Sequence, residues 1–180
     1  MKWYVAHVET GKEEQTCMFL KKEFSELSDM RVLVPKKTMY DKNKGNIRKK
    51  NHRLFPGYLF INTLMDMKKY YQIISTPNVY KVLSNKGDYF TPLPEYEINP
   101  LLRLLGENET IAASKVFIEE SKVIVKGGPL LGLEGIIKKV NKRQKRAKIL
   151  LELYNEERLV DVSIDILNVI NSNQDSLDKV

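Results

Sequence analysis

The sequence predicts an α+β protein in two parts, an amino-terminal α/β sandwich with a mostly antiparallel sheet, followed by a small all-β barrel. Three observations support this prediction. Strand-like and helix-like patterns alternate up to residue 105, the stretch that follows has no apolar periodicity, and beyond it the chain contains only short strand-like segments. We therefore expect domains at residues 1–105 and 116–180, joined by a linker at residues 106–115.

The chain opens with a predicted strand and helix. Residues 2–8 carry apolar side chains on both alternating faces, which is typical of a buried strand. Glu13 and Glu14 then favour a helix N-terminus, and apolar side chains follow at spacings of three and four: Cys17, Leu20, Phe24 and Leu27. Residues 30–34 form a short predicted strand, which Pro35 ends.

Residues 36–53 are polar and basic, and they predict a long, exposed hairpin or loop around the Asn-Lys-Gly-Asn sequence at 43–46. This segment contains eight lysine and arginine residues and one acidic residue, Asp41. Its excess of positive charge equals the net charge of the whole chain, +7. Two interpretations remain open, a solvated excursion and a nucleic-acid contact.

Residues 54–61 join a Pro-Gly corner to an almost wholly apolar run. Proline fixes φ and cannot donate a hydrogen bond to a sheet, so Pro56 suits the first residue of a strand, and Gly57 permits a close approach of the backbone. A strand over residues 58–62 then has apolar side chains on both faces. We therefore expect packed elements on both sides of this sheet.

Two further helices and a strand complete the first predicted domain. Asp66 is expected to cap a helix whose apolar stripe is Met67, Tyr70, Tyr71 and Ile74. Residues 79–83 predict a strand. Asn99 followed by Pro100 favours the start of another helix, and Gly106 favours its end.

The second domain is predicted to contain strands only. They are expected at residues 122–126, 133–140, 148–153 and 159–164. Short strands at this spacing favour a small barrel. Between residues 138 and 148, around a predicted hairpin tip, the chain has seven basic residues and no acidic residue.

The composition argues against an enzyme or a metal site. The chain has one cysteine and two histidines, and Cys17 falls on an apolar stripe, where a buried thiol is expected rather than a nucleophile. We expect no cofactor and no metal. The apolar run at the amino terminus is too short for a signal peptide, and 18 consecutive apolar residues occur nowhere, so a cytoplasmic monomer without a membrane partner is expected.

Two motifs give the chain a resemblance to a known family. The Phe-Pro-Gly-Tyr sequence at 55–58 resembles the signature of the NusG family of transcription factors. Residues 123–137 resemble the KOW motif, a strand-loop-strand element with a hallmark glycine at Gly135. The order of these motifs along the chain is also that of NusG proteins, which implies a factor that binds elongating bacterial RNA polymerase and is not an enzyme.

The resemblance implies a polymerase-docking segment. Relatives dock an apolar surface onto the clamp helices of the largest polymerase subunit, and the matching residues are Phe55, Pro56, Tyr58 and Phe60. Strand alternation sends some of these rings into the core, so burial is an equally good explanation of them.

Further contacts are implied on the second helix. Lys69, Tyr70 and Tyr71 lie where the specialised relative RfaH carries a polar motif for the second large subunit, and this sequence lacks that motif. Ser75 and Thr76 match positions at which some relatives meet the displaced non-template DNA strand. A helix stop explains the same two residues without DNA.

The basic β-hairpin predicted in the second domain favours a specialised antiterminator that acts on selected operons, and in this respect the chain resembles LoaP and RfaH. Such a factor would contact a structured hairpin in nascent RNA. The RNA-binding residues would be Lys138, Lys139, Lys142, Arg143, Lys145, Arg146 and Lys148. One alternative is a general elongation or pausing factor whose KOW domain binds Rho or a ribosomal protein. A third is a KOW RNA-binding protein with no polymerase partner.

Overall fold

A computed structural model describes residues 1–25, 30–43, 46–106, 109–119 and 122–167. The first half contains a four-stranded sheet of order β2-β5-β1-β6. Its strands are β1 (Lys2–Val8), β2 (Arg31–Leu33), β5 (Tyr58–Thr63) and β6 (Val79–Val82). Every pairing in this sheet is antiparallel, and β1 lies beside β5 in register from Lys2 opposite Thr63 to His7 opposite Tyr58.

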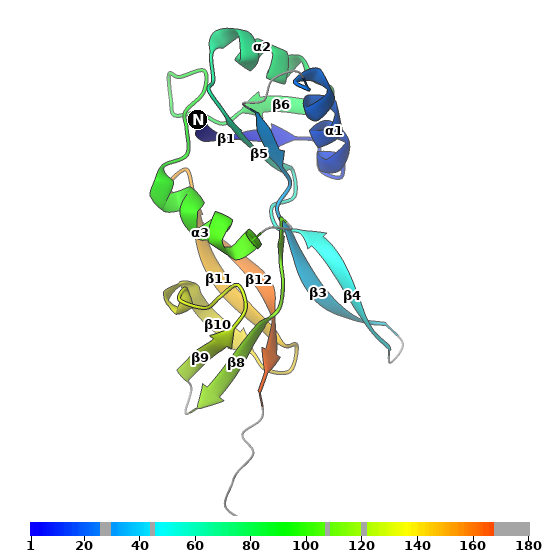
Figure 1. Ribbon diagram of the computed structural model, residues 1–180, viewed down its shortest axis with the longest axis vertical. Coiled ribbons are helices and arrows are strands. Elements are labelled where there is room, and N and C mark those ends of the chain that lie inside the picture. Colours follow the sequence, from blue (N-terminus) through cyan, green and yellow to red (C-terminus); the bar gives the residue numbers. More distant parts are fainter. Residues whose placement is uncertain (26–29, 44–45, 107–108, 120–121, 168–180) are drawn as a thin grey trace, which may run out of the picture.

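Helices cover both faces of this sheet, as the apolar pattern of β5 predicts (Figure 1). On one face, Leu59 and Ile61 pack with residues of α1 (Glu13–Glu23) and α2 (Met67–Ser75). On the other face, Phe60 packs with residues of α3 (Glu95–Leu105). The helix α3 lies between the first sheet and the carboxy-terminal strands, so it belongs to the packing of both halves.

The first two helices begin where the sequence indicates. Glu13 and Glu14 form the first turn of α1, and the Asp66 carboxylate caps α2 by accepting from the Lys69 N–H at 2.7 Å. The stripe predicted for α2 is shifted, because Ile73 is its fully buried residue while Met67 and Tyr71 are exposed. For α1, Cys17, Leu20 and Phe24 are buried as predicted, and Leu27 lies outside the described residues.

The predicted start of α3 is wrong. The helix begins at Glu95, so that Pro100 lies inside it. A proline in a helix removes one backbone hydrogen bond. The extra turn before the proline contributes two buried side chains, Glu97 and Ile98, and their contacts offset this loss.

The basic segment forms a hairpin of β3 (Lys36–Asn43) and β4 (Asn46–Arg53), as predicted. Residues 44–45 lie outside the described residues. The base of the hairpin is packed rather than solvated, since Thr38 and Met39 are buried. A two-residue strand, β7 (Thr110–Ile111), pairs with β3 in parallel, and this strand falls within the stretch expected to be a linker.

The carboxy-terminal half is a curled five-stranded sheet of order β10-β11-β12-β8-β9, consistent with a small barrel. Its strands are β8 (Ser114–Glu119), β9 (Lys122–Gly127), β10 (Ile137–Asn141), β11 (Arg146–Leu153) and β12 (Glu156–Ile166). The strand β8, which pairs in parallel with β12, was not predicted. The strand expected at 133–140 is also corrected, because Glu134–Ile136 forms a 3-10 turn before β10.

A glycine fixes the entry of the chain into this barrel. Gly128 has φ +92°, and a Cβ atom there would lie 2.8 Å from the Cα of Ser114. Leu130 N–H donates to Ser114 Oγ at 3.0 Å in the same turn. Backbone atoms cannot yield as a flexible side chain can, so only glycine fits this position.

Gly128→Ala is therefore expected to destabilise the protein by about 1–3 kcal/mol, through a strained φ and a backbone clash. The adjacent Gly127→Ala is the matched control, since a Cβ there would meet nothing within 4 Å. Urea denaturation followed by circular dichroism measures both variants. Equal midpoints for the two would contradict the close approach at Gly128.

No helix in the described part of the chain is long and apolar enough to cross a membrane.

Candidate docking and nucleic-acid interfaces

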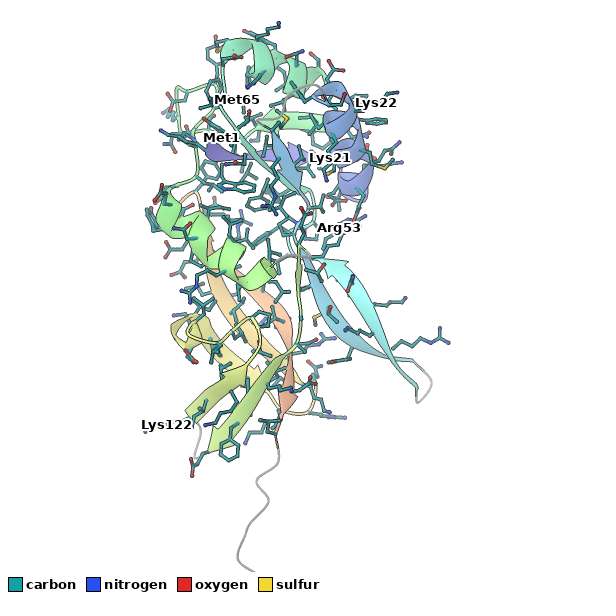
Figure 2. All side chains as sticks on the ribbon, in the orientation of Figure 1. Met1, Lys21, Lys22, Arg53, Met65 and Lys122 are labelled. Carbon is teal, nitrogen blue, oxygen red and sulfur yellow. The ribbon has the colours of Figure 1, made fainter. Side chains whose placement is uncertain are left out.

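A buried carboxylate holds the Pro56-Gly57 corner in place. Glu13, in the first turn of α1, is fully buried. Its two oxygens accept from Gly57 N–H at 2.7 Å and from Gly11 N–H at 2.9 Å, and Arg53 Nε lies 2.9 Å from Glu13 Oε2. Arg53 lies where the hairpin leaves the first sheet (Figure 2). One side chain therefore fixes the corner, the β1–α1 turn and the base of the hairpin.

The segment that follows this corner has both core and surface residues. Phe55 and Phe60 are 6% and 0% exposed, and their ring centroids lie 5.8 Å apart. Pro56 is exposed and Tyr58 is half-buried, with its ring 5.3 Å from that of His7. The structure therefore places two of the four predicted docking residues in the core and two at the surface.

A groove runs along this segment, between the first sheet and the turn that joins β11 to β12. Pro56, Tyr58 and Lys81 line one side. Tyr154 and Glu157 line the other. The buried Phe55 and Phe60 belong to the same core as Leu151, Leu153 and Val160 of the barrel, and Phe55 lines the groove together with Leu153 and Val160.

A pair of hydrogen bonds joins α3 to the β11–β12 turn. The buried Glu97 carboxylate accepts from Tyr154 N–H at 2.6 Å and from Asn155 N–H at 2.9 Å. Both turn residues have positive φ, 54° and 58°, which directs successive N–H groups to one side and creates a site for an anion. Glu97 supplies that anion.

The Tyr154 side chain extends the same contact. Its hydroxyl donates to the Thr91 carbonyl at 2.8 Å, and burial raises the pKa of Tyr154 above its ordinary value. A bulky residue with positive φ is uncommon. This conformation is held here by hydrogen bonds to the first half of the chain.

The predicted DNA residues lie beside a groove between α1 and α2, which is lined by Phe19, Lys22, Tyr71, Ser75 and Thr76 among others. Thr76 is buried, and its hydroxyl donates to the Gln72 carbonyl at 3.1 Å. Ser75 is exposed. The structure thus gives Thr76 a helix-end role and leaves Ser75 on the surface of the groove.

The other predicted residues of α2 differ from one another in exposure. Lys69 Nζ donates to the Leu64 carbonyl at 3.0 Å. The Tyr70 ring packs between Tyr89 and Phe90, with centroids 5.6 Å from each. Tyr71 is the exposed member, and half of its surface is accessible.

The basic residues of the barrel gather on β10, on β11 and on the turn between them. Lys142, Arg143 and Lys145 are exposed on the turn, which Asn141 stabilises by accepting from Gln144 N–H at 2.9 Å. The remaining members lie on the strands: Lys138, Lys139, Arg146 and Lys148. The structure therefore brings all seven predicted RNA-binding residues onto one hairpin.

A sequence model described as "Transcription termination factor nusG" matches residues 1–102 of this chain. The chain belongs to the NusG family. The NusG transcription termination/antitermination protein of Halalkalibacterium halodurans is 26% identical over 166 residues, which cover 89% of this chain and 93% of the relative. The corresponding protein of Pseudomonas aeruginosa is 23% identical and covers 89% and 94%.

The fold resembles that of a solved NusG structure. A solved structure concerning domain interaction in Thermotoga maritima NusG covers 90% of this chain and 93% of its own, with a TM-score of 0.59 and 24% identity. At this identity the likeness shows a shared fold, which is the two-domain fold that the sequence predicts. The match of residues 1–102 to the NusG sequence model confirms the resemblance to NusG proteins at the level of the family.

Sequence reasoning missed the residues that join the two halves of this NusG-family chain. Glu97 and Tyr154 are 57 positions apart, and no local pattern pairs them. The strands predicted at 148–153 and 159–164 also leave five residues between them, where the structure has the two-residue turn Tyr154-Asn155. In the described part of the chain, no group of three or more His, Cys, Asp or Glu side chains is placed to hold a metal ion.

Proposed function

We propose that this NusG-family protein binds elongating RNA polymerase through residues 1–105 and promotes processive antitermination at selected operons. In this proposal residues 116–180 form a KOW domain that contacts a structured RNA. The chain would then act as a specialised antiterminator, like LoaP and RfaH. Membership of the family supports a role in transcription termination or antitermination. The RNA contact is what would make the factor specialised.

The single observation that carries the RNA contact is the β10–β11 hairpin. Its seven basic residues include three that are fully solvent-facing at the turn, and no acidic residue lies between 138 and 148. Phosphates of a helical RNA are recognised by charge and shape. A basic turn projecting from a rigid barrel suits that kind of recognition better than it suits base stacking, which needs aromatic side chains.

The proposed polymerase surface combines Pro56 and Tyr58 with the rings of Phe55 and Phe60. Because these rings belong to a core shared with the barrel, we propose that the barrel leaves the first sheet when the surface docks. The exposed Tyr71, with Lys69 and Tyr70 on the same helix, is proposed as a separate contact with the second large subunit. If polymerase binds only the arrangement in which the barrel has left the first sheet, polymerase shifts the chain toward that arrangement. The size of the shift is set by the difference between the affinities of polymerase for the two arrangements.

The groove between α1 and α2 is the proposed site for the non-template DNA strand. Ser75 offers a hydroxyl at its surface, and the groove is also lined by a cation, Lys22, and a carboxylate, Glu23. Thr76 would act by holding the end of α2, since its hydroxyl is already bonded to Gln72.

A general elongation or pausing factor is the second candidate, and the curated relatives favour it because both bear the plain NusG description. In that case the carboxy-terminal domain would bind Rho or a ribosomal protein, and the basic hairpin would show no preference for RNA structure.

The test is RNA binding by the full-length chain over a salt series, with a synthetic RNA stem-loop as the probe. Replacing Arg143 and Lys145 by glutamine is expected to weaken binding about thirtyfold and to reduce the salt slope by about 1.8, because two phosphate contacts are lost. Lys68→Gln, which changes an exposed lysine of α2, is the control. Binding no tighter than to duplex DNA would favour the general factor.

Capture of the full-length chain by immobilised RNA polymerase tests the other half of the proposal. Failure to bind, together with intact RNA binding, would point to an RNA-binding protein without a polymerase partner.

A further inference from the structure

The first residues of β3 lie beside β12 on the outer surface of the barrel, and the rest of the β3–β4 hairpin points away from the barrel (Figure 1). Met39 Sδ lies 3.7 Å from Ser163 Oγ, and both residues are buried, at 4% and 2% exposure. Ser163 alternates with the inward-facing Val162 and Ile164, so it belongs to the outer face of the barrel. That outer face is therefore covered by β3 at this point.

The register of the barrel strands aligns side chains toward this contact. Lys139 lies opposite Lys148, and Lys148 lies opposite Asp161. In the next row, Arg146 lies opposite Ser163. Opposed residues share a face of the sheet, so both rows run across the outer face of the barrel to the place where β3 lies.

The hairpin continues these rows with its own cations. Lys37 is two residues from Met39 and therefore points to the same side of β3. It interacts electrostatically with Asp161, Arg146 and Lys148. Lys50, which is exposed, lies opposite Met39 on β4.

Three cations thus meet around Asp161 where the two halves of the chain adjoin, and a second carboxylate of β12, Asp165, faces Tyr40 of β3. Lys148 Nζ lies 3.0 Å from Asp161 Oδ1. Burial lowers the pKa of Lys37, Asp161 opposes this effect, and Arg146 and Lys148 add to it. Each cation makes the other two harder to hold there, and a bound anion would relieve that repulsion.

We propose that one structured RNA binds across the contact between β3 and β12, which we call the seam. Its phosphates are bound by Lys37 and Lys50 of the hairpin and by Arg146 and Lys148 of the barrel. This inference rests on the proposed RNA-binding function and extends it to the amino-terminal half. The planar guanidinium of Arg146 suits paired contacts with phosphate oxygens. The basic β10–β11 turn continues the same surface, so a helical RNA would contact both domains.

Binding across the seam makes RNA affinity depend on the arrangement of the domains. If the barrel leaves the first sheet, the RNA keeps Arg146 and Lys148 but loses Lys37 and Lys50. The two equilibria are linked: if separation of the barrel lowers the affinity for RNA by some factor, bound RNA lowers the equilibrium constant for separation by the same factor.

The experiment measures binding of a fluorescent synthetic RNA stem-loop to the full-length chain by anisotropy over a salt series. Lys37→Gln and Lys50→Gln are each expected to weaken binding about fivefold near 0.1 M salt and to reduce the salt slope by just under one, since each removes one phosphate contact. Lys37→Arg should bind like the wild type. Lys86→Gln, an exposed lysine on the loop after β6, is the matched control.

The outcomes separate this inference from the function on which it rests. Wild-type affinity for both Lys37→Gln and Lys50→Gln, with weaker binding by Arg146→Gln, would overturn the seam and keep the RNA-binding barrel. Wild-type affinity for Arg146→Gln as well would overturn both. Equal loss of RNA and duplex DNA would overturn the assignment to RNA. If Lys37→Gln lowers the melting temperature, the RNA affinity of Lys50→Gln becomes the test of the seam, because Lys50 is exposed.

Discussion

Glu13→Ala is expected to lower the free energy of unfolding by about 3 kcal/mol, because it leaves the buried Gly57 N–H and the more exposed Gly11 N–H without their acceptor and removes the inner partner of Arg53. The loss should be largest at the corner itself. Amide hydrogen exchange at Gly57, whose N–H donates to Glu13, should accelerate more than exchange in the centre of β1. Urea denaturation followed by circular dichroism gives the global effect.

Glu14→Ala is the control for this prediction. Glu14 also pairs with Arg53, but its side chain is 41% exposed, and a surface pair of this kind contributes at most about 1 kcal/mol. Glu13→Gln keeps the shape and one acceptor oxygen, so an intermediate loss is expected. Similar losses for Glu13→Ala and Glu14→Ala would show that the corner does not depend on the buried carboxylate.

Glu97→Ala is expected to separate the barrel from the first sheet. The change leaves the Tyr154 and Asn155 N–H groups without their acceptor in a turn of unfavourable φ, at a cost of about 2–4 kcal/mol to the closed arrangement. Because separation uncovers Phe55 and Phe60, the variant should also bind RNA polymerase more tightly if the proposed docking surface is correct.

Cysteines introduced at Lys21 and Lys122 can report the separation as a distance between two spin labels. These residues lie on α1 and at the far end of the barrel (Figure 2). The native Cys17 should interfere little, because it is buried and burial raises the pKa of its thiol. Glu95→Ala, an exposed change on the same helix, is the control. An unchanged distance distribution in Glu97→Ala would contradict the proposal that Glu97 holds the barrel against the first sheet.

The elements that the sequence predicts well are those with a clear period. The alternation in residues 2–8 and 58–62 led to β1 and β5, and the apolar pattern on both faces of β5 correctly indicated a sheet covered on both sides. The phase of α2 was wrong because five of its nine residues are apolar or aromatic, so local spacing does not select Ile73 as the buried position.

The remaining differences come from contacts between distant parts of the chain. The first turn of α3 is stabilised by Ile98 in the shared core and by Glu97 at the β11–β12 turn. The strand β8 finds its parallel partner β12 fifty residues later. The seam between β3 and β12 likewise depends on a tertiary contact, so the sequence could indicate two basic segments but not that they adjoin.

The short strand β7 determines how far an open form of the protein could extend. While Ile111 stays paired with Lys37, only residues 112 and 113 separate the anchored chain from the start of β8 at Ser114. A segment of this length spans about 10 Å. A barrel released from the sheet would therefore remain within that radius, and an RNA held by it would be presented to polymerase on the other domain at an effective concentration in the millimolar range.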